Sequence, residues 1–132
     1  MSKDPLNLSQ NFLHLGLGAK SEAQPPFSGI DWYESYTARH EKDGAEGRLV
    51  ALHRFTGDWP GWEVHPHGSE VVICIAGEIE LVQEVDGAER KITLAKGDYA
   101  INQAGVWHTA NVADEAEVLF ITAGLGTLHR PR

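Results

Sequence analysis

Residues 70–95, EVVICIAGEIELVQEVDGAERKITLA, carry the strongest structural pattern in this chain. Two runs rich in apolar residues, at 70–76 and 79–85, are followed by Asp86-Gly87, a pair that favours the tight turn of a β-hairpin. The chain then returns in a third run at 90–94. This pattern predicts short antiparallel strands joined by tight turns.

The same succession of strand and turn extends over most of the chain. Further short runs with β-branched and aromatic residues are separated by turn-forming segments, and they lie at 30–36, 48–55, 63–67, 99–102, 107–112 and 117–122. No window of about 11 or more residues shows the helical period of about 3.6 residues. The sequence therefore predicts an all-β fold, either an antiparallel sandwich or a barrel.

An N-terminal arm is predicted to precede the main β-domain. Residues 12–17 alternate with a period of two and predict a short strand, whereas the segment at 21–26 is rich in residues that break regular structure. We therefore divide the chain into an arm at 1–28 and a β-domain at 29–132. A lone strand must pair with a sheet later in the chain or in a neighbouring subunit, and exchange of the arm between two copies predicts a homodimer.

Composition and charge restrict the class of protein. A chain of 132 residues, 42% of them hydrophobic, fits one compact, soluble, globular domain. A formal net charge of −8 argues against nucleic acid and anionic membrane surfaces as partners. The longest apolar run, at 71–76, is far shorter than the ~18 residues of a membrane span. The single cysteine, Cys74, and an N-terminus without a signal-peptide profile predict a cytoplasmic protein.

Histidine and carboxylate side chains gather in the segment WEVHPHGSE at 62–70. In an extended chain His65 and His67 point to the same face, so both imidazoles can reach one metal ion. Glu70 follows after a short Gly-Ser break and can bring a carboxylate to the same centre. Two imidazoles and a carboxylate suit one divalent transition metal ion, such as iron, manganese, nickel, cobalt or zinc.

A fourth ligand is expected from a distant strand, and His108 is the best candidate. Three histidines and one glutamate would fill four positions of an octahedral ion and leave about two for water, dioxygen or a chelating substrate. Open positions are typical of a catalytic rather than a structural metal. The predicted partner is therefore a small-molecule ligand or substrate.

Two neighbours of these ligands are candidates for supporting roles. Glu63 lies two residues before His65, so in an extended strand both side chains point to the same face. Glu63 can therefore act as a general base in the cavity or hydrogen-bond to a metal ligand. The alternative is a solvent-exposed glutamate at the start of a strand. Trp107 adjoins His108 and can line a substrate pocket. Cys74 is expected to be a small buried hydrophobe. The other histidines have no partner in sequence and are expected to be structural or solvated: His14, His40, His53 and His129.

These residues resemble the first of two motifs that mark the cupins, a family of small β-barrels. That motif is written G(X)5HXH(X)3–4E(X)6G. In this chain His65, His67, Glu70 and Gly77 align with it, and Gly77 follows Glu70 at the interval that the motif requires.

A second segment resembles the other cupin motif, G(X)5PXG(X)2H(X)3N. Gly97, Gly105 and His108 fall at matching intervals. Together the two motifs cover residues 61–111. The resemblance implies a single antiparallel β-barrel of the cupin or jelly-roll type, preceded by the arm, with His65, His67, Glu70 and His108 as metal ligands.

Some positions depart from the motifs. Only two residues separate His67 from Glu70, which changes the angle at which the carboxylate approaches. Trp59 stands where the first motif has glycine, Gln103 replaces the proline of the second, and Asn111 comes one residue early. The glycine and proline changes affect turns, so the spacing of Glu70 is the departure that concerns a ligand.

The segment at 62–70 and the tail at 120–131 further resemble a group of small cupins with the pattern Trp-Glu-x-His-Pro-x-Gly-x-Glu, for which no reaction is established. The family resemblance implies a metal-binding cupin. Cupin reactions include dioxygenation, isomerisation, decarboxylation and lyase chemistry. Two open metal positions favour a dioxygenase-like enzyme acting on a small polar molecule. The alternative is a cupin that binds or senses a small molecule without converting it.

Overall fold

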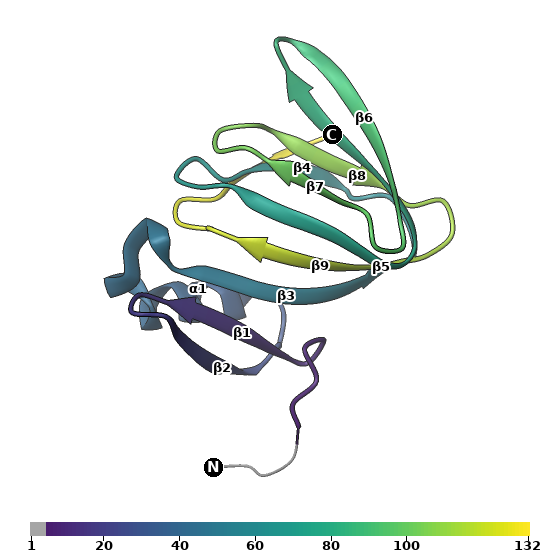
Figure 1. Cartoon of the computed structure of the whole chain (residues 1–132). Coiled ribbons are helices and arrows are strands. Elements are labelled where there is room, and N and C mark those ends of the chain that lie inside the picture. Colours follow the sequence, from purple (N-terminus) through teal and green to yellow (C-terminus); the bar gives the residue numbers. More distant parts are fainter. Residues whose placement is uncertain (1–4) are drawn as a thin grey trace.

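Strands dominate the computed structural model, which describes residues 5–132 (Figure 1). Within that range the helical segments are α1 (Ile30–Arg39) and a 3-10 helix (Glu41–Glu46), and no helix is long and apolar enough to cross a membrane. The all-β prediction is confirmed. The strands are β1 (Asn11–Gly16), β2 (Lys20–Pro26), β3 (Arg48–Phe55), β4 (Gly61–Val64), β5 (Glu70–Val85), β6 (Ala88–Ala95), β7 (Tyr99–Asn102), β8 (His108–Asn111), β9 (Ala116–Thr122) and β10 (Leu128–Pro131).

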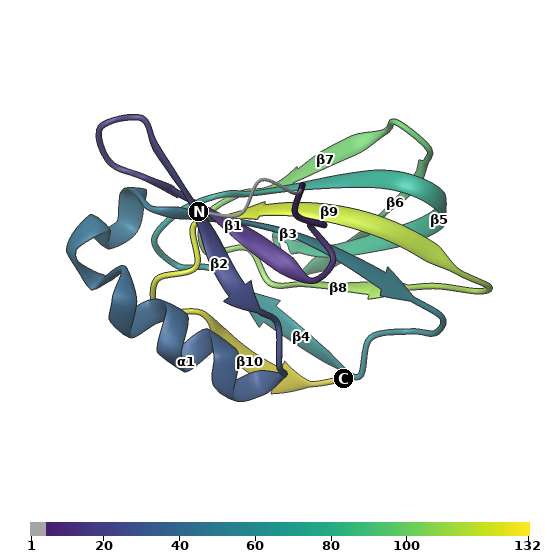
Figure 2. The ribbon, with the colours of Figure 1, turned by 90° about the horizontal axis from the view of Figure 1, so that it is seen from below.

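The strands form two antiparallel sheets that share β5 (Figure 2). One sheet has the order β2-β1-β3-β9-β5-β7, and the other has the order β10-β4-β8-β5 with β6 also paired to β5. The first half of β5, up to Gly77, pairs with β9, and the second half, from Glu78, pairs with β6. A jelly-roll arrangement results, in which one long strand connects the two layers.

Gly77 is the point at which β5 passes from one sheet to the other. The register with β9 shifts between Cys74 and Ala76, which is a β-bulge, and Gly77 has a φ of 72°. A Cβ atom at this position would lie 2.1 Å from the carbonyl oxygen of Glu115. Glycine is required here because it alone tolerates both the positive φ and the close backbone approach.

The main hydrophobic core lies between the two layers. Alternate residues of β5 and β9, among them Val72, Cys74 and Phe120, point inward and are at most 6% exposed. The prediction that Cys74 is a buried hydrophobe is confirmed. A second, smaller cluster, which includes Phe12 and Trp32, packs α1 against the sheet that contains β1 and β3.

The segment 30–36, predicted to be a strand, is the first part of helix α1, so that prediction is wrong. Trp32 and Tyr36 lie four residues apart on one helix face, where their rings stack with centroids 5.4 Å apart. Trp32 packs edge-on against Phe12, whereas Ile30 is 87% exposed. The aromatic content resembles that of a strand, and a ten-residue helix that buries one narrow stripe shows little helical period.

The N-terminal arm is a hairpin rather than a single strand. The predicted strand is β1, and the segment 21–26, predicted to break regular structure, belongs to β2. β2 lies at the edge of its sheet, where Pro25 and Pro26 are tolerated although they lack an N–H group. β1 pairs with β3 of the same chain, so the arm joins the sheet of its own subunit.

Candidate metal centre

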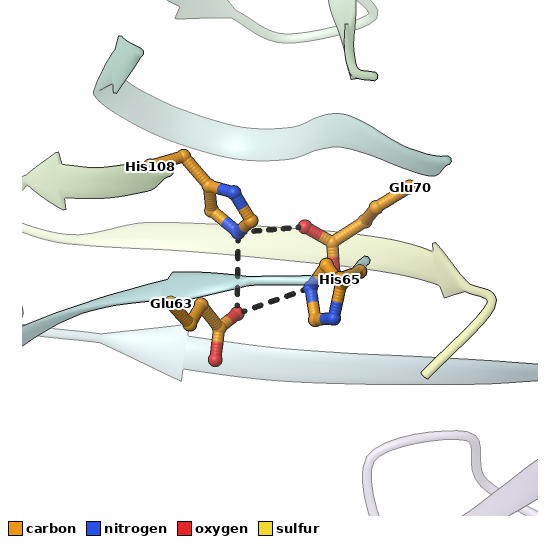
Figure 3. Close-up of side chains that lie close together, drawn as sticks. All are labelled: Glu63, His65, Glu70 and His108. Carbon is orange, nitrogen blue, oxygen red and sulfur yellow. Dashed lines mark hydrogen bonds and ion pairs between the residues drawn. The ribbon is translucent and has the colours of Figure 1, made fainter. Parts of the chain in front are cut away.

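Two histidines and two glutamates meet at one place in the fold (Figure 3). Glu63, His65, Glu70 and His108 each offer one ligand atom, and these atoms lie within 4.8 Å of one another. The side chains of His65, Glu70 and His108 are 5%, 3% and 0% exposed, whereas that of Glu63 is 24% exposed. The group is therefore withdrawn from water except on the side of Glu63.

The pairing of distant strands brings these side chains together. Glu63 in β4 lies directly opposite His108, the first residue of β8. His65 follows Glu63 by two residues and keeps the same face. Glu70 is the first residue of β5 and lies opposite Thr122 of β9. Each sheet thus contributes to the centre, which lies where the two layers approach each other.

Each imidazole faces both carboxylates through its Nε2 atom (Figure 3). The Nε2 atom of His65 lies 3.2 Å from Glu70 Oε2, and that of His108 lies 3.2 Å from Glu70 Oε1. Glu63 Oε1 lies 3.4 Å from His108 Nε2 and 3.6 Å from His65 Nε2. The four donor atoms therefore surround one point.

Hydrogen bonds on the far side of each ring set its orientation. His108 Nδ1 lies 3.2 Å from the carbonyl oxygen of Val106, which can only accept, so this nitrogen carries the proton. His65 Nδ1 lies 2.7 Å from the hydroxyl of Thr127, which itself donates to the carbonyl of Gly124 and so accepts from the ring. In the neutral rings both Nε2 atoms therefore direct a lone pair at the centre. Such contacts are typical of metal-bound histidines.

Two polar residues hold the carboxylate of Glu70, and a third supports one of them. The hydroxyl of Thr122 donates to Oε2 at 2.6 Å, and the amide of Asn102 donates to Oε1 at 3.0 Å. Gln83 in turn donates to Asn102 Oδ1 at 2.8 Å. No local pattern in the sequence identifies these residues, because they come from β9, β7 and the far half of β5 and share no spacing with Glu70.

Burial and charge act in opposite directions on the pKa values of the group. Burial alone would lower the pKa of each imidazole, but Glu63 and Glu70 outweigh it and raise the pKa of His65 and of His108 to about 9. Burial would raise the pKa of each carboxyl, but the two histidines lower that of Glu70 to about 2 and also lower the pKa of Glu63. Without a metal ion the group therefore consists of two imidazolium–carboxylate pairs.

The donor set fits a divalent transition metal ion. His65 Nε2 is buried, and its contacts with Glu70 Oε2 at 3.2 Å and Glu63 Oε1 at 3.6 Å lack hydrogen-bond geometry. A metal ion would satisfy this atom, and it would take the place of the imidazole protons because the neutral ring is the ligand. Two carboxylates balance the charge of a divalent ion, and a mixed imidazole and carboxylate set suits iron, manganese, cobalt, nickel or zinc.

The position of His67 differs from that of the other predicted ligands, which meet at the centre. His67 is exposed and lies outside the group. β4 ends at Val64 and the chain turns at Pro66, so the alternation that predicts a common face for His65 and His67 ends before His67. Glu63, which lies within β4 two residues before His65, is the fourth member of the group.

The contacts of two residues near the centre, Trp107 and His129, differ from those predicted. Trp107 is half-buried beneath Arg130, whose guanidinium lies 4.5 Å from the centroid of the indole ring. His129, predicted to be structural or solvated, is 72% exposed, but its Nε2 lies 3.3 Å from Glu63 Oε2. The register of β10 with β4 places His129 opposite Glu63, a pairing that no local pattern in the C-terminal tail indicates.

His14, His40 and Asp43 form a second group of possible ligand atoms in the arm. Both nitrogens of His14 have partners: Nδ1 lies 2.6 Å from the hydroxyl of Tyr36, and Nε2 lies 2.6 Å from Asp43 Oδ2. The ring of His40 stacks on that of His14 with centroids 3.7 Å apart. These contacts tie β1 to α1 and to the 3-10 helix, and we assign the group a structural role.

Comparison with known proteins agrees with this architecture. Residues 56–124 match the family model described as the cupin domain. A conserved protein with a double-stranded β-helix domain from Klebsiella pneumoniae is 24% identical over 64% of this chain and 76% of its own, with a TM-score of 0.52. Hydroxypropylphosphonic acid epoxidase from S. wedmorenis is 16% identical over 57% of this chain and 43% of its own, with a TM-score of 0.50. These two likenesses show the fold alone, and no curated protein matches the chain. Because the family model spans more than half of its residues, this chain belongs to the cupin family.

Proposed function

We propose that Glu63, His65, Glu70 and His108 hold one divalent transition metal ion and that the protein is a metal-dependent enzyme acting on a small polar molecule. The observation that carries the proposal is the convergence of the four donor atoms within 4.8 Å of one another, three of them on side chains that are at most 5% exposed. Buried carboxylates need a compensating charge, and a bound divalent ion would supply it to both.

Glu63 marks the side from which a small molecule can approach. Its side chain is 24% exposed, and it contacts His129, which is 72% exposed. A carboxylate and an imidazole in contact at an accessible site can accept and return a proton. We therefore assign Glu63 a role at the ion and His129 a role in moving a proton to and from Glu63 Oε2.

The expected reaction class follows from the donor set. A bound divalent ion would supply Lewis-acid polarisation of a substrate oxygen or, as iron or manganese, redox chemistry with dioxygen. Four protein donors leave about two positions of an octahedral ion for other ligands. A dioxygenase-like reaction is favoured on this ground, with isomerase or lyase chemistry as the other possibilities. Thr127 and Thr122 would keep His65 and Glu70 aligned throughout the reaction.

Metal content tests the first half of the proposal. Untagged protein purified anaerobically should contain about one transition metal ion per chain by elemental mass spectrometry. The His65→Ala/His108→Ala double variant should contain none, whereas His67→Ala should retain the wild-type amount because His67 lies outside the group. Absence of metal from the wild-type protein after reconstitution, or its loss in His67→Ala alone, would contradict the proposed ligand set.

Turnover tests the second half. Oxygen uptake should be measured with a panel of catechols, diketones and thiols, using protein loaded with Fe(II) and the same protein after chelation. We expect uptake with at least one class of compound that depends on the added metal and is lost in His129→Ala while metal content persists, because His129 contacts Glu63 but lies outside the group of donors. Metal-independent turnover, or full turnover in His129→Ala, would count against the assigned roles.

The alternative function is capture of a small molecule without conversion. The observation that favours it is the closed character of the centre, since three of the four donor side chains are at most 5% exposed. A metabolite that copurifies unchanged with the metal-loaded protein, and that His108→Ala releases, would support this alternative over an enzyme.

A further inference from the structure

The C-terminal segment at 124–132 contributes little to the hydrophobic core. Its strand, β10, pairs with β4 and lies at the edge of that sheet (Figure 2). Its two leucines, Leu125 and Leu128, are 40% and 57% exposed, and neither of the hydrophobic clusters described for residues 5–132 includes a member of this segment. Polar and stacking contacts must therefore hold the segment in place.

Two of these contacts reach the candidate metal centre. His65 Nδ1 lies 2.7 Å from the hydroxyl of Thr127, and His129 Nε2 lies 3.3 Å from Glu63 Oε2. Glu63 is the most exposed of the four donor side chains, at 24%. The segment therefore lies at the side on which the centre meets solvent.

A third contact fastens β10 from its other face. The guanidinium carbon of Arg130 lies 4.5 Å from the ring centroid of Trp107 and 5.1 Å from that of Trp62, and Nη2 donates to Glu84 Oε2 at 2.6 Å. A guanidinium over an indole face is attracted by the ring, and the carboxylate adds an ion pair. Because side chains alternate along a strand, Arg130 holds β10 from outside while His129 faces the centre.

The segment begins at a turn with two glycines. The amide of Thr127 bonds to the carbonyl of Gly124 at 3.2 Å, and Gly126 has a φ of 74°, which favours glycine. The preceding residue, Ala123, is buried, and β9 ends just before it. A change of conformation at the turn would therefore move residues 127–132 and leave β9 in place.

We propose that residues 124–132 are a strap that closes over the metal centre, with the turn at 124–126 as its hinge and Arg130 as its latch. The structure shows the closed state, in which the strap orients His65 and places His129 at Glu63. In the open state the edge of β4 is free, and an ion or a small molecule can enter or leave. The passage of an ion rests on the proposed function, whereas the closing of the strap does not.

The physical basis is the small number of contacts that opening would break. Segments at a sheet edge with little buried apolar surface open locally far more often than the core unfolds. Arg130 makes the stacking contacts and the ion pair of the strap, so removing its side chain should raise the open population without disturbing the core.

Hydrogen exchange of the metal-free full chain, followed by mass spectrometry, tests the strap itself. We expect the amides of residues 127–130 to exchange roughly tenfold faster in Arg130→Ala than in the wild-type protein, whereas those of β5 and β9 keep their rates. Arg130→Lys keeps a cation over the indoles and should fall between the two. Arg90→Ala, at an exposed position of β6, is the matched control and should leave the strap unchanged.

A second fastening allows a graded test. Arg132 Nη1 donates to the carbonyl oxygens of Trp59 and Ala110, at 3.1 and 3.2 Å. The Arg130→Ala/Arg132→Ala double variant should therefore exchange faster at residues 127–130 than Arg130→Ala.

Zinc release tests whether the strap controls access to the centre. Protein loaded with Zn²⁺ is mixed with an excess of a chromophoric chelator, and the rate of zinc transfer is measured. We expect transfer to be roughly tenfold faster from Arg130→Ala than from the wild-type protein or Arg90→Ala, because the ion leaves through the open state.

Several results would overturn the proposal. Residues 127–130 of the wild-type protein could exchange at the rate of an unstructured peptide, or Arg130→Ala could leave their exchange unchanged. Equal acceleration in β5 and β9 would show a loss of global stability instead of an opening strap. Faster exchange with an unchanged rate of zinc transfer would remove the role in access. A wild-type protein that binds no zinc would count against the proposed metal centre, and hydrogen exchange would then decide on the strap alone.

Discussion

Glu63 and His108 lie directly opposite each other in the register of β4 and β8, with Glu63 Oε1 3.4 Å from His108 Nε2. They are 45 residues apart in the sequence. This pair fixes the candidate metal centre to the strand pairing itself, because a shift of one residue between β4 and β8 would turn one of the two side chains to the other face.

Metal binding should release protons. The pKa values of His65 and His108 lie at about 9, so at pH 7.5 both rings of the metal-free protein carry a proton that a metal ion must displace. Titration calorimetry in buffers of different ionisation enthalpy should therefore report about two protons released per ion, and affinity should rise with pH up to about 9. An enthalpy that is the same in every buffer would contradict the protonation states assigned here.

The metal-free protein should be most stable in mildly acidic solution. His65 and His108 have pKa values raised from 6.5 to about 9, so the stability they contribute is complete below pH 6.5 and is lost as pH rises through 9. The pKa of Glu70 is lowered from 4.5 to about 2, so its contribution is present above pH 4.5 and is lost as pH falls towards 2.

Urea unfolding in the presence of a chelator measures this profile. We expect the free energy of unfolding to fall by roughly 2–4 kcal/mol between pH 6 and pH 10, since each unit of pKa shift corresponds to about 1.4 kcal/mol and the two rings share their partners. The metal-loaded protein should show no such fall over the same range. A flat profile for the metal-free protein would show that the four side chains are not ion-paired.

Removing the hydroxyl that holds Glu70 should weaken metal binding without loss of the fold. Thr122 donates to Glu70 Oε2 at 2.6 Å, and groups that orient a ligand are typically worth about 10–100-fold in metal affinity. Thr122→Val should therefore lower affinity by that amount in competition with a chromophoric chelator. Thr122→Ser should restore it, and Thr93→Val at an exposed position of β6 should have no effect. Equal affinity for Thr122→Val and the wild-type protein would remove the assigned role.

Gly77 should be far less replaceable than another glycine with the same backbone conformation. Gly77 and Gly87 have φ values of 72° and 77°, but a Cβ at Gly77 would meet the Glu115 carbonyl at 2.1 Å, whereas one at Gly87 would meet nothing within 4 Å. Gly87→Ala should cost about 1 kcal/mol from the positive φ, and Gly77→Ala should cost at least about 3 kcal/mol because backbone must also move. Similar thermal shifts for the two variants would refute this account of the bend in β5.

The strand pattern and part of the candidate centre are accessible from the sequence. The turn at Asp86-Gly87 and the apolar runs on either side predict the β5–β6 hairpin because turn chemistry and alternation are local properties. The spacing of two residues between Glu63 and His65 can also be read from the sequence, and the structure places both side chains in the group of four candidate donors. Two predictions fail because they assume that a local pattern continues. Pro66 turns the chain before His67, so the strand alternation does not reach that residue. The buried stripe of α1 that contains Trp32 is too narrow to distinguish a helix from a strand in the sequence.

The sequence by itself determined that this is an all-β chain of the cupin type and that His65, Glu70 and His108 are candidate ligands, because strand propensity, turns and motif spacing are all written along the chain. Only the tertiary structure decided that Glu63 faces His108 and that Thr122 and Asn102 hold Glu70. The physical reason is that these relationships depend on which strands pair and in which register. The strand partners and their register are set by the burial of the whole hydrophobic core, and no short segment of the sequence carries that information.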